Sequence, residues 1–149
     1  MESTPLPAGN AAPKTEEGEL KVLAVEDDPS SLAVLEHLLR GRGDSVRSVH
    51  DGAQALRILD VESFDVVLMD IKMPNMDGLD ATREIRLRDQ RTGRRNIIIA
   101  VTARAMGGDR EKFLAAGMDA YLSKPIRKDT LFHAIDTAIA ANRNPFSGA

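Results

Sequence analysis

Cysteine and tryptophan are both absent from this chain, and aromatic residues make up only 3% of it. Without cysteine there are no disulfides, thiolate metal ligands or thiol nucleophiles. The scarcity of aromatic rings argues against stacking on nucleic-acid bases and against an aromatic cage. The formal net charge of −3 gives no overall basic character that attracts nucleic acid or acidic lipid. We therefore expect no direct contact with nucleic acid.

Long apolar runs are also missing. No segment has the length of a membrane span, and the first residues lack the basic start and apolar stretch of a secretion signal. We therefore expect a cytoplasmic protein without direct membrane contact. The 149 residues, of which 42% are hydrophobic, suffice for one domain with a single core. We expect a disordered N-terminal leader or linker at residues 1–19, a folded domain at 20–142 and a C-terminal tail at 143–149.

Two hydrophobic periods alternate along the central part of the chain. Short aliphatic runs are typical of strands covered on both faces, and segments with helical spacing and capping residues lie between them. The predicted strands are Lys21–Val25, Ser45–His50, Phe64–Met69, Ile97–Val101 and Ala120–Ser123. The predicted helices begin near Pro29, Asp51, Asp77, Gly108 and Lys128, and their apolar positions include Leu87 and Leu114.

Five strand–helix units in series predict an α/β fold, a single doubly wound parallel sheet of five strands with helices on both faces. Such a sheet places ligands at the carboxyl ends of its strands. Residues able to do chemistry occur at these points. They are Glu26 and Asp27 after the first apolar run, Asp70 after the third, Thr102 after the fourth and Lys124 after the fifth. We expect these side chains to gather at one edge of the sheet.

The acidic members of this set predict a metal site and a nucleophile. Three carboxylates in one cleft repel one another unless a cation lies among them. An all-oxygen site with few protein ligands suits Mg²⁺, with Mn²⁺ as an alternative ion. Asp70 is the candidate nucleophile, because a carboxylate can attack phosphorus and hold a phosphoryl group. Lys124 and Thr102 can offer a positive charge and a hydroxyl to phosphoryl oxygens. A cis peptide bond before Pro125 is expected to aim Lys124 inward.

Over about residues 20–142 the chain resembles the receiver domains of two-component response regulators. The resemblance rests on several separated motifs in the right order, among them Lys72–Gly78 and Ala115–Ile126. It implies the flavodoxin-like (βα)5 receiver fold with strand order 2-1-3-4-5. It also implies that Asp70 accepts a phosphoryl group from a phosphohistidine. One departure concerns Asp28, because Asn often follows the acidic pair in this family, and Asp makes the metal site more acidic.

The resemblance assigns a metal-binding role to four residues. It implies that Asp27 and Asp70 are direct Mg²⁺ ligands and that the backbone carbonyl of Lys72 is a third. Glu26 is implied to act through water. The acidic pair and the phosphoacceptor thus form one site in this interpretation.

A second group of residues is implied to act in switching and in phosphoryl lifetime. Thr102 resembles the switch hydroxyl, Tyr121 the switch aromatic and Lys124 the lysine that contacts the phosphoryl group. We expect Thr102 to move toward the phosphoryl group and Tyr121 to fill the vacated space. Lys72 and Arg104 follow Asp70 and Thr102 by two positions, beside the expected path of attacking water. Their long basic side chains predict slow loss of the phosphoryl group.

The wording of three motifs narrows the resemblance to the receivers of hybrid sensor histidine kinases. The motifs span Lys72–Gly78, Thr102–Met106 and Ala115–Ile126. Such receivers exchange phosphoryl groups with a histidine kinase or a histidine phosphotransfer domain, which are the expected partners. We expect a monomer or weak dimer. We do not expect a stand-alone enzyme, although the domain is implied to catalyse its own Mg²⁺-dependent phosphorylation and dephosphorylation.

Arginine is concentrated between Arg86 and Arg95. We interpret this stretch as a solvated helix end and loop rather than as a binding patch. This interpretation assigns the stretch no part in the expected chemistry.

Four other functions fit parts of the pattern. A flavodoxin-like redox module shares the fold class, but an acidic first loop repels the phosphate of FMN. A phosphatase with an aspartyl nucleophile typically carries an acid two positions further on, where this chain has Lys72. A degenerate receiver that takes no phosphate is disfavoured by the complete residue set. A DNA-binding regulator needs an output domain, for which the residues after the last predicted helix are too few.

Overall fold

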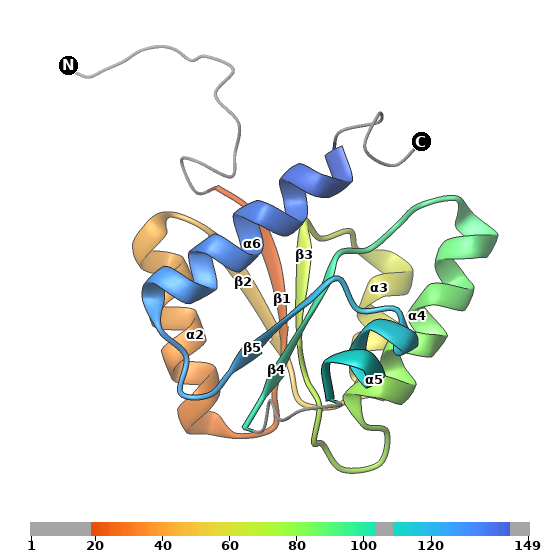
Figure 1. Cartoon of the computed structure of the whole chain (residues 1–149), viewed down its shortest axis with the longest axis horizontal. Coiled ribbons are helices and arrows are strands. Elements are labelled where there is room, and N and C mark those ends of the chain that lie inside the picture. The colour runs from red at the N-terminus through yellow and green to blue at the C-terminus, as the bar shows by residue number, and fades with distance from the viewer. Residues whose placement is uncertain (1–18, 104–108, 144–149) are drawn as a thin grey trace.

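The structure, a computed structural model, describes residues 19–103 and 109–143. Five parallel strands form one sheet in the order β2-β1-β3-β4-β5, and a helix follows each strand along the chain (Figure 1). The predicted fold and strand order are confirmed. None of the helices within these ranges is long and apolar enough to cross a membrane. The predicted leader and C-terminal tail, apart from Glu19 and Arg143, lie outside the described residues.

The element bounds agree closely with the predicted ones. The strands are β1 (Lys21–Val25), β2 (Ser45–Val49), β3 (Val66–Asp70), β4 (Ile98–Thr102) and β5 (Ala120–Ser123). The helices are α2 (Pro29–Arg42), α3 (Gly52–Val61), α4 (Gly78–Thr92), α5 (Asp109–Ala116) and α6 (Lys128–Arg143). Both β3 and β4 end one residue later than predicted, because Asp70 pairs with Val101 and Thr102 pairs with Ser123 of β5. Asp70 and Thr102 are therefore the last residues of their strands.

Three aspartates cap helices, and two of them, Asp51 and Asp77, stand where helices were predicted to begin. Each accepts a hydrogen bond from the backbone N–H three residues further on, which satisfies a donor that the first helical turn leaves unpaired. The caps are Asp28 on α2, Asp51 on α3 and Asp77 on α4. The side-chain oxygen of Gln54 accepts from the N–H of His50 at 2.7 Å. The Gln54 side chain therefore binds the residue before the capping aspartate Asp51. Strand β2 ends at Val49, one residue earlier than predicted.

Helices lie on both faces of the sheet (Figure 1), and a hydrophobic core fills the space on each face. On one face α2 and α6 contribute Leu35, Leu39, Leu131 and Ile135. On the other face α3, α4 and α5 pack against the sheet, and Phe113 is buried there. Because β1, β3 and β4 are covered on both sides, their residues are buried along almost the whole length.

Two predicted apolar positions are wrong. Leu87 on α4 and Leu114 on α5 are 50% and 49% exposed. The buried face of α4 carries Ala81, Ile85 and Asp89, which are spaced by four residues. Leu87 lies two positions from Ile85, on the opposite side of the helix. Asp89, the next residue on this face after Ile85, is a buried carboxylate.

The arginine-rich stretch is only partly solvated, which corrects its interpretation. Arg94 and Arg95 are exposed, as expected for a loop. Arg86 and Arg88 are half-buried and hydrogen-bonded, and Arg88 donates to the carbonyl of Leu56 at 2.7 Å. The arginine-rich stretch therefore includes arginines that connect α4 to neighbouring elements by hydrogen bonds. The sequence pattern does not reveal this, because the partners are backbone carbonyls and distant aspartates.

Candidate functional site

The topology brings the predicted residues to the carboxyl edge of the sheet. Strand β1 lies beside β3 in parallel register, with Val25 opposite Met69. The residues that follow, Glu26 and Asp27 on one side and Asp70 on the other, therefore meet at the same edge. Strand β5 lies beside β4, and the backbone N–H of Lys124 donates to the carbonyl of Thr102 at 2.7 Å.

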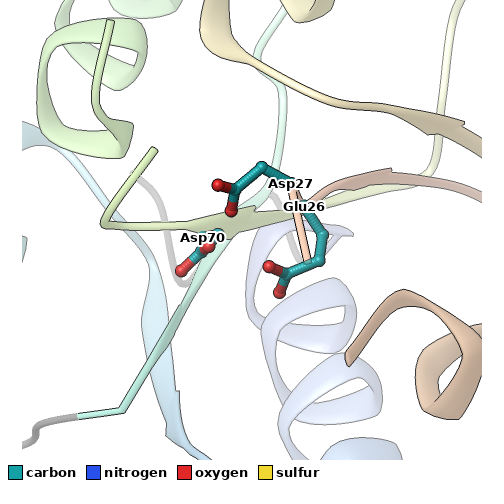
Figure 2. Close-up of side chains that lie close together, drawn as sticks. All are labelled: Glu26, Asp27 and Asp70. Carbon is teal, nitrogen blue, oxygen red and sulfur yellow. The ribbon is translucent and has the colours of Figure 1, made fainter. Parts of the chain in front are cut away.

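Glu26, Asp27 and Asp70 form an acidic cluster (Figure 2). One carboxylate oxygen from each lies within 4.8 Å of the others. Glu26 and Asp70 are only 1% and 5% exposed, whereas Asp27 is exposed. The backbone N–H of Asp28 donates to Oε2 of Glu26 at 3.1 Å, which helps to orient the carboxylate. The predicted convergence of the three acids is confirmed.

Lys124 reaches into this cluster from the loop after β5. Its Nζ lies 3.0 Å from Oε1 of Glu26 and 3.7 Å from Oδ1 of Asp70. The Lys124–Pro125 peptide bond is cis, as predicted. Burial acts to lower the pKa of Lys124, but contact with Glu26 and the charge of Asp70 outweigh it and raise the pKa. The side chain is therefore a firmly protonated ammonium group.

The carboxyl group of Asp70 is strongly perturbed. Burial, and after it the adjacent carboxylate of Glu26, raise its pKa from 3.8 to about 7, against the opposing effect of Lys124. One ammonium group thus does not offset the concentration of negative charge at this edge. The donor set fits a divalent cation, because buried carboxylate oxygens are the ligands that hard cations prefer.

The loop between β3 and α4 is held against Asp70 by a glycine that the sequence reasoning did not single out. A Cβ at Gly78 would lie 2.3 Å from the carbonyl oxygen of Asp70. The N–H of Gly78 donates to the carbonyl of Ile71 at 2.8 Å. The start of α4 therefore approaches the backbone of the phosphoacceptor candidate closely, as only glycine permits. Its position four residues after Pro74 was the available signal.

The remaining predicted site residues lie at or near the same edge. Thr102 is 5% exposed at the end of β4. Tyr121 on β5 is 38% exposed, and its ring lies against that of Phe113 with centroids 5.9 Å apart. Lys72 is exposed two residues beyond β3. Arg104 lies outside the described residues.

The fold and the acid–lysine cluster define a flavodoxin-like α/β domain with an acidic site at the carboxyl edge of its sheet. Residues 22–136 match the family of the response regulator receiver domain, and the chain belongs to that family.

Known proteins with similar sequences and structures agree. The chain is 40% identical over 116 residues to the sensor histidine kinase GacS of Pseudomonas protegens, an alignment that covers 77% of this chain. The crystal structure of the receiver domain of sensor histidine kinase PA1611 from Pseudomonas aeruginosa, with a magnesium ion in its active-site cleft, is 45% identical. It has a TM-score of 0.73 and covers 81% of this chain and 98% of that one.

A second similar structure comes from Saccharomyces cerevisiae. It is a complex of the histidine phosphotransfer protein Ypd1 with the receiver domain of Ssk1, at 26% identity and a TM-score of 0.79. The similarity covers 86% of this chain and 94% of that chain. The present chain spans only 13% of the length of GacS, so it corresponds to one domain of that kinase.

Proposed function

We propose that this receiver domain accepts a phosphoryl group on Asp70 from a phosphohistidine and passes it on or switches conformation. The observation that carries the proposal is the convergence of three carboxylates and Lys124 at the carboxyl edge of the sheet. Asp70 is the candidate nucleophile because it belongs to this group and stands at the end of a buried strand. Acidic residues that are only part of a solvated surface do not require a lysine among them.

Mg²⁺ is the proposed metal, with Mn²⁺ as an alternative. Asp27 and Asp70 would bind it directly, the backbone carbonyl of Lys72 would be a third ligand, and Glu26 would act through water. The raised pKa of Asp70 supports a bound cation, because burial and Glu26 disfavour the carboxylate in its absence. When bound, the ion neutralises negative charge on the phosphoryl oxygens and orients them. The pattern of oxygen ligands and expected waters suits Mg²⁺ better than Ca²⁺.

The proposed reaction is a substitution at phosphorus. A carboxylate oxygen of Asp70 attacks the phosphorus atom, an O–P bond forms, and the P–N bond to the donor imidazole breaks with its electron pair on nitrogen. Lys124 stabilises the charge on the phosphoryl oxygens, and the Thr102 hydroxyl donates to one of them. In hydrolysis, water attacks the same phosphorus, which returns the carboxylate and inorganic phosphate. The domain thus promotes its own phosphorylation without being a stand-alone enzyme.

Switching is proposed to follow from the new phosphoryl oxygens. Thr102 moves toward them and Tyr121, exposed in this structure, turns inward. To convert a mostly inactive population into a mostly active one requires a preference of about 5.5 kcal/mol for the active form.

The proposed partners are a histidine kinase or a histidine phosphotransfer domain. The complex of the Ssk1 receiver with Ypd1 supports a phosphotransfer partner, because that receiver has the same fold. The proposal includes residues 20–142 as the receiver domain, a cytoplasmic location and a monomer or weak dimer. It includes no direct contact with nucleic acid or membrane, in keeping with the net charge of −3.

Incubation with Mg²⁺ and acetyl phosphate or phosphoramidate tests the acceptor, with intact mass as the readout. The wild type should gain the mass of one phosphoryl group, and the Asp70→Asn variant should gain none. Removal of Mg²⁺ by a chelator should abolish the gain. Equal labelling of the wild type and Asp70→Asn would refute Asp70 as the acceptor. Yellow colour with flavin fluorescence would support the redox alternative instead, and turnover of a generic phosphate ester would support a phosphatase.

A further inference from the structure

Arg86 is the centre of an ionic cluster at the edge of the sheet opposite to Asp70. Its guanidinium donates to the carbonyls of Gly117 and Asn96 at 2.8 and 2.6 Å. It also donates to the carboxylates of Asp89 and Asp119 at 2.7 and 2.9 Å. The side chain is only 14% exposed. One planar cation thus joins α4, the loop before β4 and the turn between α5 and β5.

Asp119 completes the same cluster from the α5–β5 turn. Its Oδ2 accepts from the N–H of Ile98 at 2.8 Å, and its Oδ1 accepts from Arg95 at 2.6 Å. Arg95 in turn donates to the side chain of Asn142 on α6 at 3.1 Å. The turn that leads into β5 is therefore tied to α4, β4 and α6 at once.

Helix α5 buries two of its side chains, Phe113 and Ala116, against the sheet. Immediately after α5, Gly117 adopts a φ of 104°, and a Cβ there would lie 2.9 Å from Cγ of Arg86. The arginine thus packs on the glycine as well as bonding to its carbonyl. Any displacement of the end of α5 must disrupt this contact.

We infer that Arg86 and Asp119 form a clamp that holds α5 in its present position and opposes activation by a phosphoryl group on Asp70. The inference rests on the proposed function. The phosphoryl group acts at the carboxyl edge of the sheet, through Thr102 and Tyr121. The clamp restrains the opposite end of β5, because Asp119 lies two residues before Tyr121. Arg86 is therefore a positioning residue. It sets how strongly a phosphoryl group must favour the active conformation before that conformation becomes populated.

Arg86→Lys tests the clamp, because an ammonium group cannot satisfy four acceptors arranged around a planar fork. The ligand is beryllium fluoride, which binds carboxylates in the place of a phosphoryl group, at saturating Mg²⁺. We expect Arg86→Lys to bind it at least about fivefold more tightly than the wild type, as allosteric coupling of ordinary size requires. Affinity for Mg²⁺ alone should stay within about twofold, since the clamp touches no metal ligand. Tyr121 is the only tyrosine and the chain has no tryptophan. A change in intrinsic fluorescence on beryllium fluoride binding therefore reports a change in the surroundings of Tyr121.

Arg88→Lys is the matched control. Arg88 lies on the same helix and also bonds a carbonyl and an aspartate, but its partners are Leu56 and Asp60 near α3. A loss of general stability should be similar in both variants, whereas only Arg86→Lys should tighten beryllium fluoride binding. Equal or weaker binding by Arg86→Lys, or equal tightening by Arg88→Lys, would overturn the inference.

Asp119→Asn provides a second test, which decides the question if Arg86→Lys does not fold. It keeps an acceptor for Ile98 but loses the charge that pairs with Arg86, and it should tighten binding in the same direction. The double variant should gain little more than either single one, because both remove one interaction. Additive gains would contradict a shared clamp. If the wild type binds no beryllium fluoride at all, the proposed function fails, which is a different outcome from unchanged binding in the variants.

Discussion

The ammonium group of Lys124 is nearer to Glu26 than to Asp70, with Nζ–O distances of 3.0 and 3.7 Å. Lys124 therefore neutralises a carboxylate that is only 1% exposed while it remains within reach of Asp70, the proposed phosphoacceptor. A phosphoryl group on Asp70 would compete with Glu26 for this lysine. The pairing thus links the stability of the resting domain to the chemistry of the site.

Lys124→Ala should destabilise the domain, because it leaves the buried carboxylate of Glu26 without its cation. We expect a loss of about 2–3 kcal/mol in the free energy of unfolding at neutral pH without Mg²⁺. Because the pKa of Lys124 is raised, the wild-type ion pair with Glu26 stays charged at neutral pH. Its contribution to stability is lost only as the pH rises through the pKa of Lys124 in the folded protein. Urea denaturation measures the loss. Lys128→Ala, at an exposed position, should change little, and added Mg²⁺ should restore part of the stability of Lys124→Ala. A loss that Mg²⁺ does not reduce would contradict the electrostatic explanation.

Asp70→Asn should stabilise the domain in a pH-dependent way. The folded pKa of about 7 lies above the usual 3.8, so the folded wild type binds more protons than the unfolded chain between these values. Wild-type stability therefore falls as pH rises through this window. The variant lacks this loss, so its advantage should grow from about pH 4 to about pH 7 and reach about 2–4 kcal/mol, at about 1.4 kcal/mol for each pKa unit.

Thermal or urea unfolding in chelator at several pH values checks this expectation. Asp129→Asn, at an exposed carboxylate on α6, serves as the control and should show no such trend. A constant difference between Asp70→Asn and the wild type from pH 4 to pH 8 would show that Asp70 is not perturbed in the folded protein.

The position of this site was predictable from the sequence because the carboxyl ends of parallel strands meet at one edge. Apolar runs that end in Asp70 and in Glu26 therefore predicted a shared cleft without knowledge of any distance. The pairing of Lys124 with Glu26 was not predictable, since it depends on the path of the loop after β5. The clamp at Arg86 was hidden for another reason. Its acceptors include two backbone carbonyls, and a sequence does not show which carbonyls a fold leaves unpaired.

Gly78→Ala should distort the loop that follows Asp70, the proposed phosphoacceptor. The added Cβ would lie 2.3 Å from the carbonyl oxygen of Asp70, so the start of α4 must shift. We expect a cost of about 1–3 kcal/mol in the free energy of unfolding and slower phosphorylation by acetyl phosphate. Gly41→Ala is a matched control on α2, where a Cβ meets nothing within 4 Å. It should stabilise the protein by about 0.5–1 kcal/mol, because alanine favours the helix. Two variants with equal effects would show that the close approach at Gly78 is relieved without cost.

The lifetime of the phosphoryl group should depend on the residues at positions 72 and 104. Lys72 is exposed two residues beyond Asp70, so its side chain is free to lie across the path of an attacking water. Arg104 follows Thr102 by the same spacing. We therefore expect the double variant Lys72→Asn with Arg104→Glu to lose its phosphoryl group faster than the wild type. Decay of intact phosphorylated mass after removal of the donor measures this rate. The exposed pair Arg127→Asn with Lys128→Glu changes charge by the same amount at the start of α6 and should leave the rate unchanged. Equal decay of the wild type and the 72/104 variant would show that both side chains point away from the phosphoryl group.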